Sequence, residues 1–472
     1  MLSIPHFLGL DTKYPVVSGD WIERVYLDST ASTLALAETR DSVNRFMAHY
    51  SNTHSEIHNA SRISTDVLGW CHSTILSYFE TDENNYTAIF SGAGSTAAIN
   101  KFACKMAGHS FNSPVLISLM EHHSNDLPHR INARRVKHIK LRNYADGAGE
   151  VDTVALESEL RAELPAYIAL TAVSNVTGII NPITTIAKLA NKYKVPLLVD
   201  FANGAAHWPL CLENNEYWID AIAFSSHKIY APSGPGVLIV RNELLEMLTP
   251  TEVGGGAVTS VTLDHYVYDE DFFHRENAGT PNLPGIVALS VALYRLKEVG
   301  LKNIHEHETK LTKYLIEGLQ KIDRIRIYGS LDPQVRRIST VSFNIIGIPH
   351  SLAGAILNDY FNIAIRNQCF CAHPYVKHLM FQDFLELEAT SDHEISTDEI
   401  DQYRGMLRAS IGIYSSIKDI DHLLGALQRI CNNSEYYTTS YVYDEEFRHK
   451  TFRLNYEIEK ILGVVNPGLV LE

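Results

Sequence analysis

Four polar segments in this chain of 472 residues each follow a short apolar run, and each carries side chains suited to chemistry. The strongest is Ser225-Ser-His-Lys228, which follows the apolar run 221–224 and precedes a turn rich in glycine and proline. Burial lowers the pKa of a lysine ammonium, and the free amine that results is a nucleophile for aldehydes. Lys228 is therefore a candidate catalytic nucleophile. The alternative is a lysine that extends along the rim of a sheet into solvent.

Two further segments supply a carboxylate and an imidazole. Asp200 follows the apolar run 196–199, 28 residues before Lys228. A carboxylate there can hold a proton on a heterocyclic nitrogen, as the pyridinium of pyridoxal phosphate (PLP) requires, although a helix N-cap is the simpler interpretation. His123 lies in Met120-Glu-His-His123-Ser-Asn125, just after the run 115–119. Its ring could stack on a flat cofactor, and the alternative is an ordinary core or surface histidine.

The fourth segment has the form of a phosphate-binding turn. The run that ends at Phe90 leads into Ser-Gly92-Ala-Gly94-Ser95-Thr96, where a glycine-rich turn precedes a predicted helix. The amides at the start of a helix and the hydroxyls of Ser95 and Thr96 can bind an anion. The segment lacks the dinucleotide pattern and the P-loop lysine, so neither of those sites is expected. The four segments together predict one PLP site.

Short apolar runs alternate with helical segments from about residue 20 to 240, and this pattern indicates an α/β fold. The runs are nearly continuous in apolar residues, as expected for parallel strands covered on both faces. Ligands bind outside the carboxyl ends of such strands, where all four segments lie. One long amphipathic helix is expected over 285–325, followed by a small α+β unit. The predicted strands are Tyr86–Phe90, Val115–Leu119, Tyr167–Val173, Pro196–Val199, Ala221–Phe224, Gly236–Val240, Val341–Ile345 and Ile363–Ile365, and the further predicted helices are Thr184–Tyr193, Ser351–Tyr360 and Lys418–Ile430.

Composition excludes several classes of protein. Hydrophobic residues make up 45% of the chain, which argues against a mainly disordered protein. The net charge of −15 argues against a broad electrostatic binder of nucleic acid. No apolar run approaches the roughly 20 residues that span a bilayer, and residues 1–10 do not resemble a signal peptide. The six cysteines are too scattered for a disulfide scaffold, so we expect a cytoplasmic protein.

From Tyr26 to Ile430 the sequence resembles class V PLP enzymes, and most closely the branch of cysteine desulfurases and selenocysteine lyases. The resemblance implies the aspartate-aminotransferase fold (an α/β fold with a mostly parallel central sheet and a smaller α+β C-terminal domain), bound PLP, and a homodimer that acts on an amino acid. The motifs that carry it are Met120-Glu-His-His-Ser-Asn125, Val173-Ser-Asn-Val-Thr-Gly178, Leu198-Val-Asp200, Ser225-Ser-His-Lys228, Ala278-Gly-Thr-Pro-Asn282 and Leu407-Arg-Ala-Ser410.

The resemblance also implies roles for individual residues. Lys228 is expected to bond to the cofactor aldehyde, His123 to stack on its ring, and Asp200 to pair with its ring nitrogen. Asn203 stands where the family usually has a longer glutamine beside the phenolic oxygen. Cofactor contacts, mostly to the phosphate, are expected from Ser95, Thr96, Ser225 and His227, and from Thr280 of the other subunit. Substrate contacts, chiefly to the α-carboxylate, are expected from Asn175, His58 and Arg408, whose planar guanidinium suits bidentate binding.

Cys371 decides which reaction the resemblance implies. In desulfurases a mobile loop after an Arg-x-Gly segment carries a nucleophilic cysteine, and Cys371 follows Arg366-Asn-Gln368 at that position. Its thiolate would take sulfur from the substrate as a persulfide. Gln368 departs from the glycine of the family, and 37 residues separate Cys371 from Arg408, more than in compact desulfurases. A metal site is not expected, because a closed zinc site needs four ligands; a buried, inert Cys371 is the remaining alternative.

We expect a large PLP-binding domain over 26–284 and a small domain over 285–435 that carries the Cys371 loop. Residues 1–25 should pack with the small domain, and 436–472 form an extension in which Glu445–Ile461 is a candidate surface helix. An insertion at 383–401 carries eight acidic residues and no lysine or arginine, as a solvated loop would.

The leading functional hypothesis is removal of sulfur or selenium from L-cysteine or L-selenocysteine, with a possible sulfur-acceptor protein. The second is another class V reaction, namely transamination, epimerisation or β-elimination. The third is a protein of this fold that acts mainly as a binding or sulfur-carrier partner.

Overall fold

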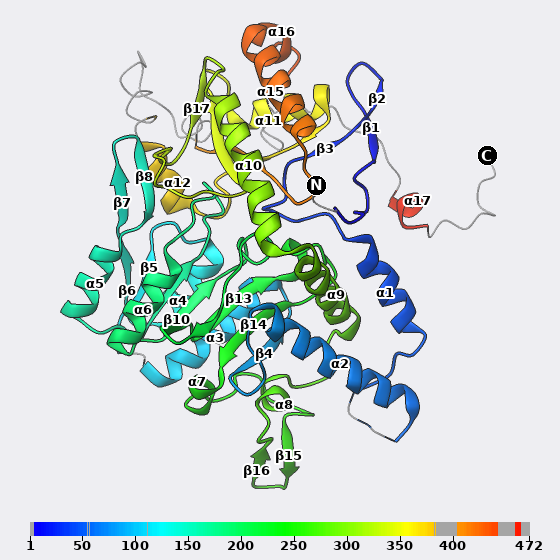
Figure 1. The fold of residues 1–472 in the computed structure, drawn as a ribbon, viewed down its shortest axis with the longest axis vertical. Coiled ribbons are helices and arrows are strands. Elements are labelled where there is room, and N and C mark those ends of the chain that lie inside the picture. The colour runs from blue at the N-terminus through cyan, green and yellow to red at the C-terminus, as the bar shows by residue number, and fades with distance from the viewer. Residues whose placement is uncertain are drawn as a thin grey trace.

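A computed structural model describes residues 4–53, 55, 57–110, 112–381, 383, 404–441 and 458–463. Its centre is a seven-stranded sheet in the order β4-β14-β13-β10-β9-β5-β6 (Figure 1). Strands β13, β10, β9, β5 and β6 run parallel to one another, whereas β14 is antiparallel to both β13 and β4. The strands are β4 (Tyr86–Ser91), β5 (Val115–Ser118), β6 (Val136–Ile139), β9 (Tyr167–Thr171), β10 (Leu197–Asp200), β13 (Ala221–Ser225) and β14 (Gly236–Arg241).

Helices cover both faces of this sheet, which explains the continuous apolar runs of its strands. Leu198 of β10 packs in a cluster with α3, whereas its neighbours Leu197 and Val199 pack in a cluster with α2, α6 and α9. The predicted fold class is therefore confirmed. The helices of this part are α1 (Ala37–Met47), α2 (Asn59–Tyr78), α3 (Gly94–Ser110), α4 (Leu127–Asn132), α5 (Thr153–Ala162), α6 (Ile183–Tyr193), α7 (Asn242–Glu246), α8 (Phe272–Glu276) and α9 (Leu283–Val299).

The single helix expected over 285–325 is wrong, because the structure has two helices there. Helix α9 ends at Val299 and α10 (Leu301–Leu319) begins after Gly300, whose φ of +87° is unfavourable for other residues. Helix α10 then runs beside a second, four-stranded sheet in the order β17-β18-β21-β20 (Figure 1). This part comprises β17 (Ile325–Ile327), β18 (Thr340–Ile345), α11 (His350–Phe361), β19 (Ile363–Ala364), β20 (Arg366–Gln368), α12 (His373–Leu379), β21 (Met406–Ser410), α15 (Ile417–Asn432) and α16 (Ser434–Thr438).

The second sheet has its own hydrophobic core. Apolar residues of α10, α11 and α15 pack against β18 and β21 in a cluster separate from those of the large sheet. The N-terminal segment joins this part, since β3 (Val25–Tyr26) pairs with β19 and the Val17 amide donates to the Asp359 carbonyl on α11. The domain boundaries at 25, 284 and 435 stay predictions.

Short strands form small excursions from the two sheets. They are β1 (Lys13–Pro15) with β2 (Trp21–Glu23), β7 (Leu141–Tyr144) with β8 (Gly147–Val151), β11 (Glu213–Asn214) with β12 (Tyr217–Trp218), and the projecting hairpin of β15 (Val258–Val261) and β16 (Tyr266–Tyr268).

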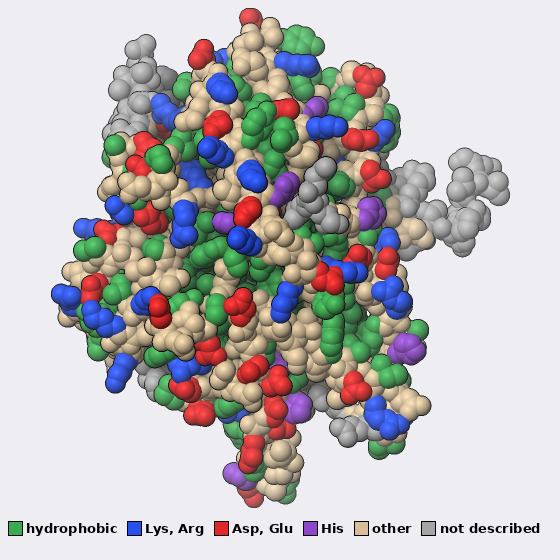
Figure 2. Space-filling view, viewed as in Figure 1, with side chains coloured by type: hydrophobic (Ala, Val, Ile, Leu, Met, Phe, Trp, Pro, Cys, Tyr) green, Lys and Arg blue, Asp and Glu red, His purple; other side chains and the backbone are tan. Residues whose placement is uncertain are grey.

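Two expected surface segments lie mostly outside the described residues. Of the acidic insertion only Asp383 is described, and its carboxylate accepts from the Tyr328 hydroxyl at 2.7 Å. Of the tail helix expected over 445–461, α17 (Ile458–Leu462) is described. Basic and acidic side chains intermingle over the face shown in Figure 2. No helix within the described ranges is long and apolar enough to cross a membrane.

Candidate active site

A cavity of about 520 Å³ lies at the carboxyl ends of β10 and β13, beside the start of α3. It brings together side chains from all four segments singled out in the sequence and adds the loop before α12. The predicted residues that line it are Ser95, Thr96, Asn175, Asp200, Asn203, Ser225, His227, Lys228, Cys371 and Arg408.

Lys228 ends a short 3-10 helix, Ser226–Lys228, that follows β13 directly. Its Nζ donates to Asn203 Oδ1 at 3.0 Å. Burial lowers the pKa of Lys228 to about 8, and the nearby Asp200 partly opposes this effect. A substantial fraction of Lys228 is therefore the neutral amine near physiological pH, which is the form that attacks an aldehyde or accepts a proton.

Asp200 is the last residue of β10 and is only 4% exposed. Its Oδ1 accepts from the Ala202 amide at 3.0 Å. Burial raises the pKa of Asp200, and the hydrogen bond from the Ala202 amide and the nearby charge of Lys228 partly oppose this increase. A buried carboxylate on a cavity wall is stabilised by a cationic or protonated group placed against it.

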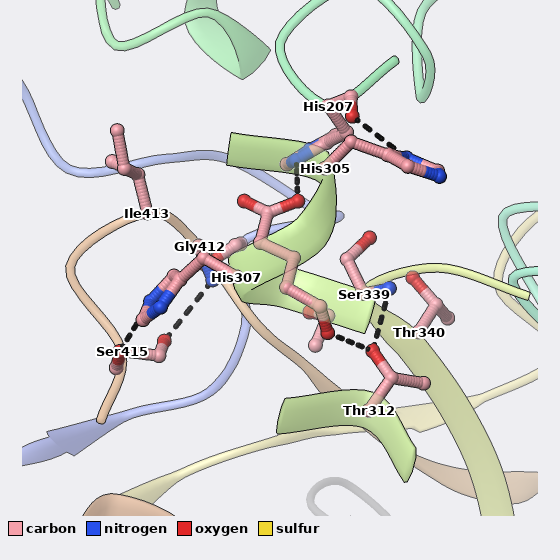
Figure 3. Close-up of polar contacts among 12 residues, drawn as sticks. His207, His305, His307, Thr312, Ser339, Thr340, Gly412, Ile413 and Ser415 are labelled. Atoms are coloured by element: carbon pink, nitrogen blue, oxygen red, sulfur yellow. Dashed lines mark hydrogen bonds and ion pairs between the residues drawn. The ribbon is translucent and has the colours of Figure 1, made fainter. Parts of the chain in front are cut away.

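The turn that carries Asp200 and Asn203 is anchored to α10. His207 Nδ1 lies 2.8 Å from Glu308 Oε2, and both side chains are almost fully buried. His305 Nδ1 also donates to the His207 carbonyl at 3.3 Å (Figure 3).

One turn further along the same face of α10, Thr312 Oγ1 donates to the Glu308 carbonyl and accepts from the Ser339 amide (Figure 3). Helix α10 thereby connects the turn after β10 to the segment that leads into β18.

The start of α3 forms a polar cradle. The Ser95 amide donates to Ser225 Oγ at 2.7 Å, and the hydroxyls of Thr96 and Ser124 lie 2.7 Å apart. Gly94 has a φ of +58°, and a Cβ there would lie 2.6 Å from Ser225 Oγ, so no larger residue fits. Helix amides with clustered hydroxyls are an established form of anion site.

His122 lines the cavity, whereas the predicted His123 does not. Burial lowers the pKa of His122 to about 3, so its ring is neutral. The ring of His123 lies 4.7 Å from that of His373 and nearly parallel to it, and its Nε2 is 3.0 Å from His373 Nδ1. In this chain His122, and not the predicted His123, thus faces the cavity, and the stacking role predicted for His123 stays a prediction. The side chains of His122 and His123 point in different directions, and the sequence alone does not indicate which of the two faces the cavity.

Arg408 lies on β21 with its side chain 4% exposed. Its Nη1 donates to the Asn175 carbonyl at 2.9 Å, and its Nη2 lies 3.4 Å from Asp28 Oδ1. Its Nε has no hydrogen-bond partner among the described residues. Burial lowers the pKa of Arg408 to about 10, which leaves it charged at neutral pH. Asp28, which the sequence analysis missed, also lies 3.8 Å from Arg366, another residue of the cavity wall.

Cys371 is exposed and reaches the cavity from the loop between β20 and α12. Gln368, Phe370 and Cys371 have φ angles of +98°, +52° and +55°, a region that non-glycine residues seldom occupy. The Cys371 carbonyl accepts from the His123 amide at 2.7 Å. The alternative of a buried cysteine is wrong for Cys371.

Comparison with known proteins places this arrangement in a family. The sequence model described as aminotransferase class V matches residues 25–423. The chain belongs to the class V aminotransferase family. Its relatives include a cysteine desulfurase of Shigella sonnei, 30% identical over 426 residues that cover 88% of this chain and 96% of the relative. A cysteine desulfurase of Klebsiella pneumoniae is 30% identical over 416 residues, covering 86% and 93%.

Solved structures share the fold of this class V aminotransferase. The cysteine desulfurase CsdA of Escherichia coli has a TM-score of 0.70 and 26% identity, over 87% of this chain and 95% of that chain. A cysteine desulfurase of Thermococcus onnurineus has a TM-score of 0.75 and 24% identity over the same shares, and that likeness concerns the fold alone.

Besides His123, two residues predicted for the site, His58 and Thr280, lie outside the cavity of this class V aminotransferase chain. His58 is the N-cap of α2, where its Nδ1 accepts from the Ser61 amide at 3.2 Å, and its predicted contact with substrate stays a prediction. Thr280 is exposed, and its Oγ1 accepts from Asn52 Nδ2 at 3.2 Å. Its role in the site of a second subunit stays a prediction.

Proposed function

We propose that this chain is a PLP-dependent cysteine desulfurase that removes sulfur from L-cysteine, or selenium from L-selenocysteine, and leaves alanine. The observation that carries the proposal is that an exposed cysteine, Cys371, lines the same cavity as Lys228 and Arg408. A nucleophilic thiol, a reactive amine and a carboxylate-binding guanidinium are the three groups that this chemistry requires.

The cavity residues fit PLP in charge and shape. The cradle of Ser95, Thr96 and Ser225 would hold the phosphate, and Asp200 the protonated ring nitrogen. The ring of His122 would lie against the pyridine, since a neutral imidazole offers a flat face. When bound, PLP supplies an electron sink for bonds broken at the substrate α- and β-carbons.

Lys228 and Arg408 prepare the substrate for bond cleavage. The guanidinium of Arg408 and the side-chain amide of Asn175 would bind the α-carboxylate and fix the amino acid in one orientation. Lys228, with its lowered pKa, would then accept the α-proton and return it to carbon. Its contact with Asn203 keeps the amine beside the reacting atoms.

Cys371 would take the sulfur. Its thiolate attacks the substrate sulfur, an S–S bond forms, and the C–S bond breaks to leave a persulfide on Cys371. The loop position suits transfer of that sulfur, because an exposed thiol can meet a reductant or an acceptor protein. We propose a homodimer, an acceptor protein and a cytoplasmic location on the strength of the family.

The test supplies L-cysteine and a thiol reductant to the PLP-loaded enzyme and measures alanine and sulfide. Cys371→Ser should abolish both products and keep the cofactor absorbance, whereas Cys104→Ser, which alters an exposed cysteine on α3, should change neither. Absence of alanine from fully loaded wild-type enzyme would exclude the proposal. A panel of amino acids followed by cofactor absorbance would then identify another class V reaction.

A further inference from the structure

Phe370, the residue before Cys371, contacts both groups assigned above to the substrate carboxylate. Its carbonyl accepts from Asn175 Nδ2 at 2.7 Å. Its ring centroid lies 4.6 Å from the guanidinium carbon of Arg408, within the range of a cation–π interaction. The side chain is only 8% exposed and joins the core of the large sheet. The nucleophile loop and the carboxylate site thus share one residue.

The backbone of this loop is held in an unfavourable conformation. Three non-glycine residues among 368–371 have positive φ, and such residues persist only where their surroundings fix them. The fixing contacts are the Asn175 bond to the Phe370 carbonyl and the His123 bond to the Cys371 carbonyl. Loss of either hydrogen bond would weaken the interactions that hold residues 368–371 in this unfavourable backbone conformation.

A bound amino acid competes for the first of these contacts. A carboxylate accepts a stronger hydrogen bond than a neutral peptide carbonyl does, because its oxygens are charged. The donor in question, Asn175 Nδ2, now serves Phe370, and the neighbouring Arg408 has an Nε without a partner among the described residues. A carboxylate bound at Arg408 would therefore compete with the Phe370 carbonyl for the hydrogen bond from Asn175 Nδ2.

We propose that Phe370 is a positioning residue that couples occupation of the carboxylate site to release of the Cys371 loop. The substrate carboxylate replaces the Phe370 carbonyl at Asn175, and the strained segment then leaves its resting conformation. The His123–His373 contact stays in place at the other end of the loop, so Cys371 pivots rather than detaches. The inference rests on the proposed function only in its choice of Asn175 and Arg408 as the carboxylate site.

The experiment measures how fast iodoacetamide labels Cys371 in the PLP-loaded enzyme, with the labelled peptide quantified by mass spectrometry. L-alanine serves as the probe, because it carries the α-carboxylate and has no sulfur to transfer. At an L-alanine concentration that saturates the change in cofactor absorbance, labelling of Cys371 should rise about fivefold, the factor for one net hydrogen bond. Labelling of the exposed Cys104 should not change.

Three variants separate coupling from simple packing. Phe370→Leu keeps the carbonyl but loses the ring contact with Arg408 that helps to hold the loop in its resting conformation. It should therefore label faster than wild type without L-alanine and gain less on its addition, whereas Phe370→Tyr keeps the ring and should behave as wild type. Phe272→Leu removes a ring that lies 4.5 Å from the Arg275 guanidinium, away from the cavity, and should keep the full response. A Phe370→Leu variant that matches wild type in both rates would overturn the proposal.

Each remaining outcome of the labelling experiment either supports or contradicts the proposed coupling. Labelling slowed or unchanged by bound L-alanine in wild type contradicts the coupling even where L-cysteine is turned over. Faster labelling in an enzyme that makes no alanine from L-cysteine supports the coupling and rejects only the desulfurase activity. Absence of any absorbance change with L-alanine contradicts the carboxylate site itself.

Discussion

The two sides of the cavity are built in opposite ways. On the cofactor side, Asp200 ends one strand in the middle of the large sheet and Lys228 follows another, and buried contacts fix this region, among them the one between His207 and Glu308. On the thiol side, Cys371 is exposed on a loop of positive φ angles. Under the proposed function, the cofactor side must hold its geometry through each turnover, whereas the Cys371 thiol must move to collect sulfur and transfer it. We therefore expect the cofactor side to be rigid, because its residues come from the interior of the large sheet. We expect the thiol side to be mobile, because its loop follows β20 at the edge of the second sheet.

Removal of the central amine should have the largest effect. Lys228→Ala is expected to lower alanine formation from L-cysteine by about 10³-fold or more, because it removes both the cofactor bond and the proton acceptor. Lys310→Ala, which alters an exposed lysine on α10, should match wild type. Substantial turnover by Lys228→Ala would show that the cofactor side does not depend on this residue.

The second prediction breaks the anchor of the cofactor side. Glu308→Ala leaves His207 buried without its partner, and we expect a loss of about 3–5 kcal/mol in the free energy of unfolding measured with urea. Glu306→Ala on the exposed face of the same helix should cost under about 0.5 kcal/mol. Equal effects of the two variants would mean that the turn does not rely on α10.

The third prediction concerns pH. Since burial lowers the pKa of Lys228 to about 8, the neutral amine of the cofactor-free protein gains about tenfold per pH unit below 8 and levels off above it. The rate of PLP capture, followed by absorbance, should show this rise and plateau. A rate that continues to climb toward pH 10 would mean that Lys228 keeps its ordinary pKa.

The fourth prediction separates the adjacent histidines. His122→Ala should weaken PLP binding by about two- to tenfold and shift the cofactor absorbance, as expected for loss of one aromatic contact. His122→Phe should restore most of the affinity, and His123→Ala should leave the absorbance unchanged. The reverse ranking of the two alanine variants would return the stacking role to His123.

The last prediction, with the smallest expected effect, compares hydrogen exchange on the cofactor side and on the thiol side of the wild-type protein. Backbone amides of Leu198 and Val199 lie in a strand paired on both edges, so their hydrogen exchange should approach the limit set by global unfolding. Amides of 369–372 should exchange faster. Equal protection of both segments would remove the contrast between a fixed and a mobile side.

Sequence reasoning predicted the cofactor side better than the thiol side, and the reason is physical. Apolar runs locate buried strands, and polar residues at their ends then converge, so Asp200 and Lys228 were placed correctly beside one cavity. The break at Gly300 was missed because the apolar periodicity continues through it.

Contacts between segments distant in sequence left no comparable signal. Three features depend on how distant segments pack together in the fold. They are the contact of Arg408 with Asp28, the contact of the Phe370 ring with Arg408, and the position of His122 rather than His123 in the cavity wall. Periodicity describes one element at a time, so these features required the folded chain.

The position of β14 has a consequence for synthesis of the chain. Strand β4, which leads into the cradle, has β14 as its sheet partner, and Gly236 at the start of β14 packs against the backbone of Gly94. β4 thus leaves the ribosome long before the strand that completes it, and Arg408 follows later still. The proposed cofactor site is therefore complete only once β14, which ends at Arg241, has been made, and until then β4 is an unpaired strand edge to which a chaperone could bind.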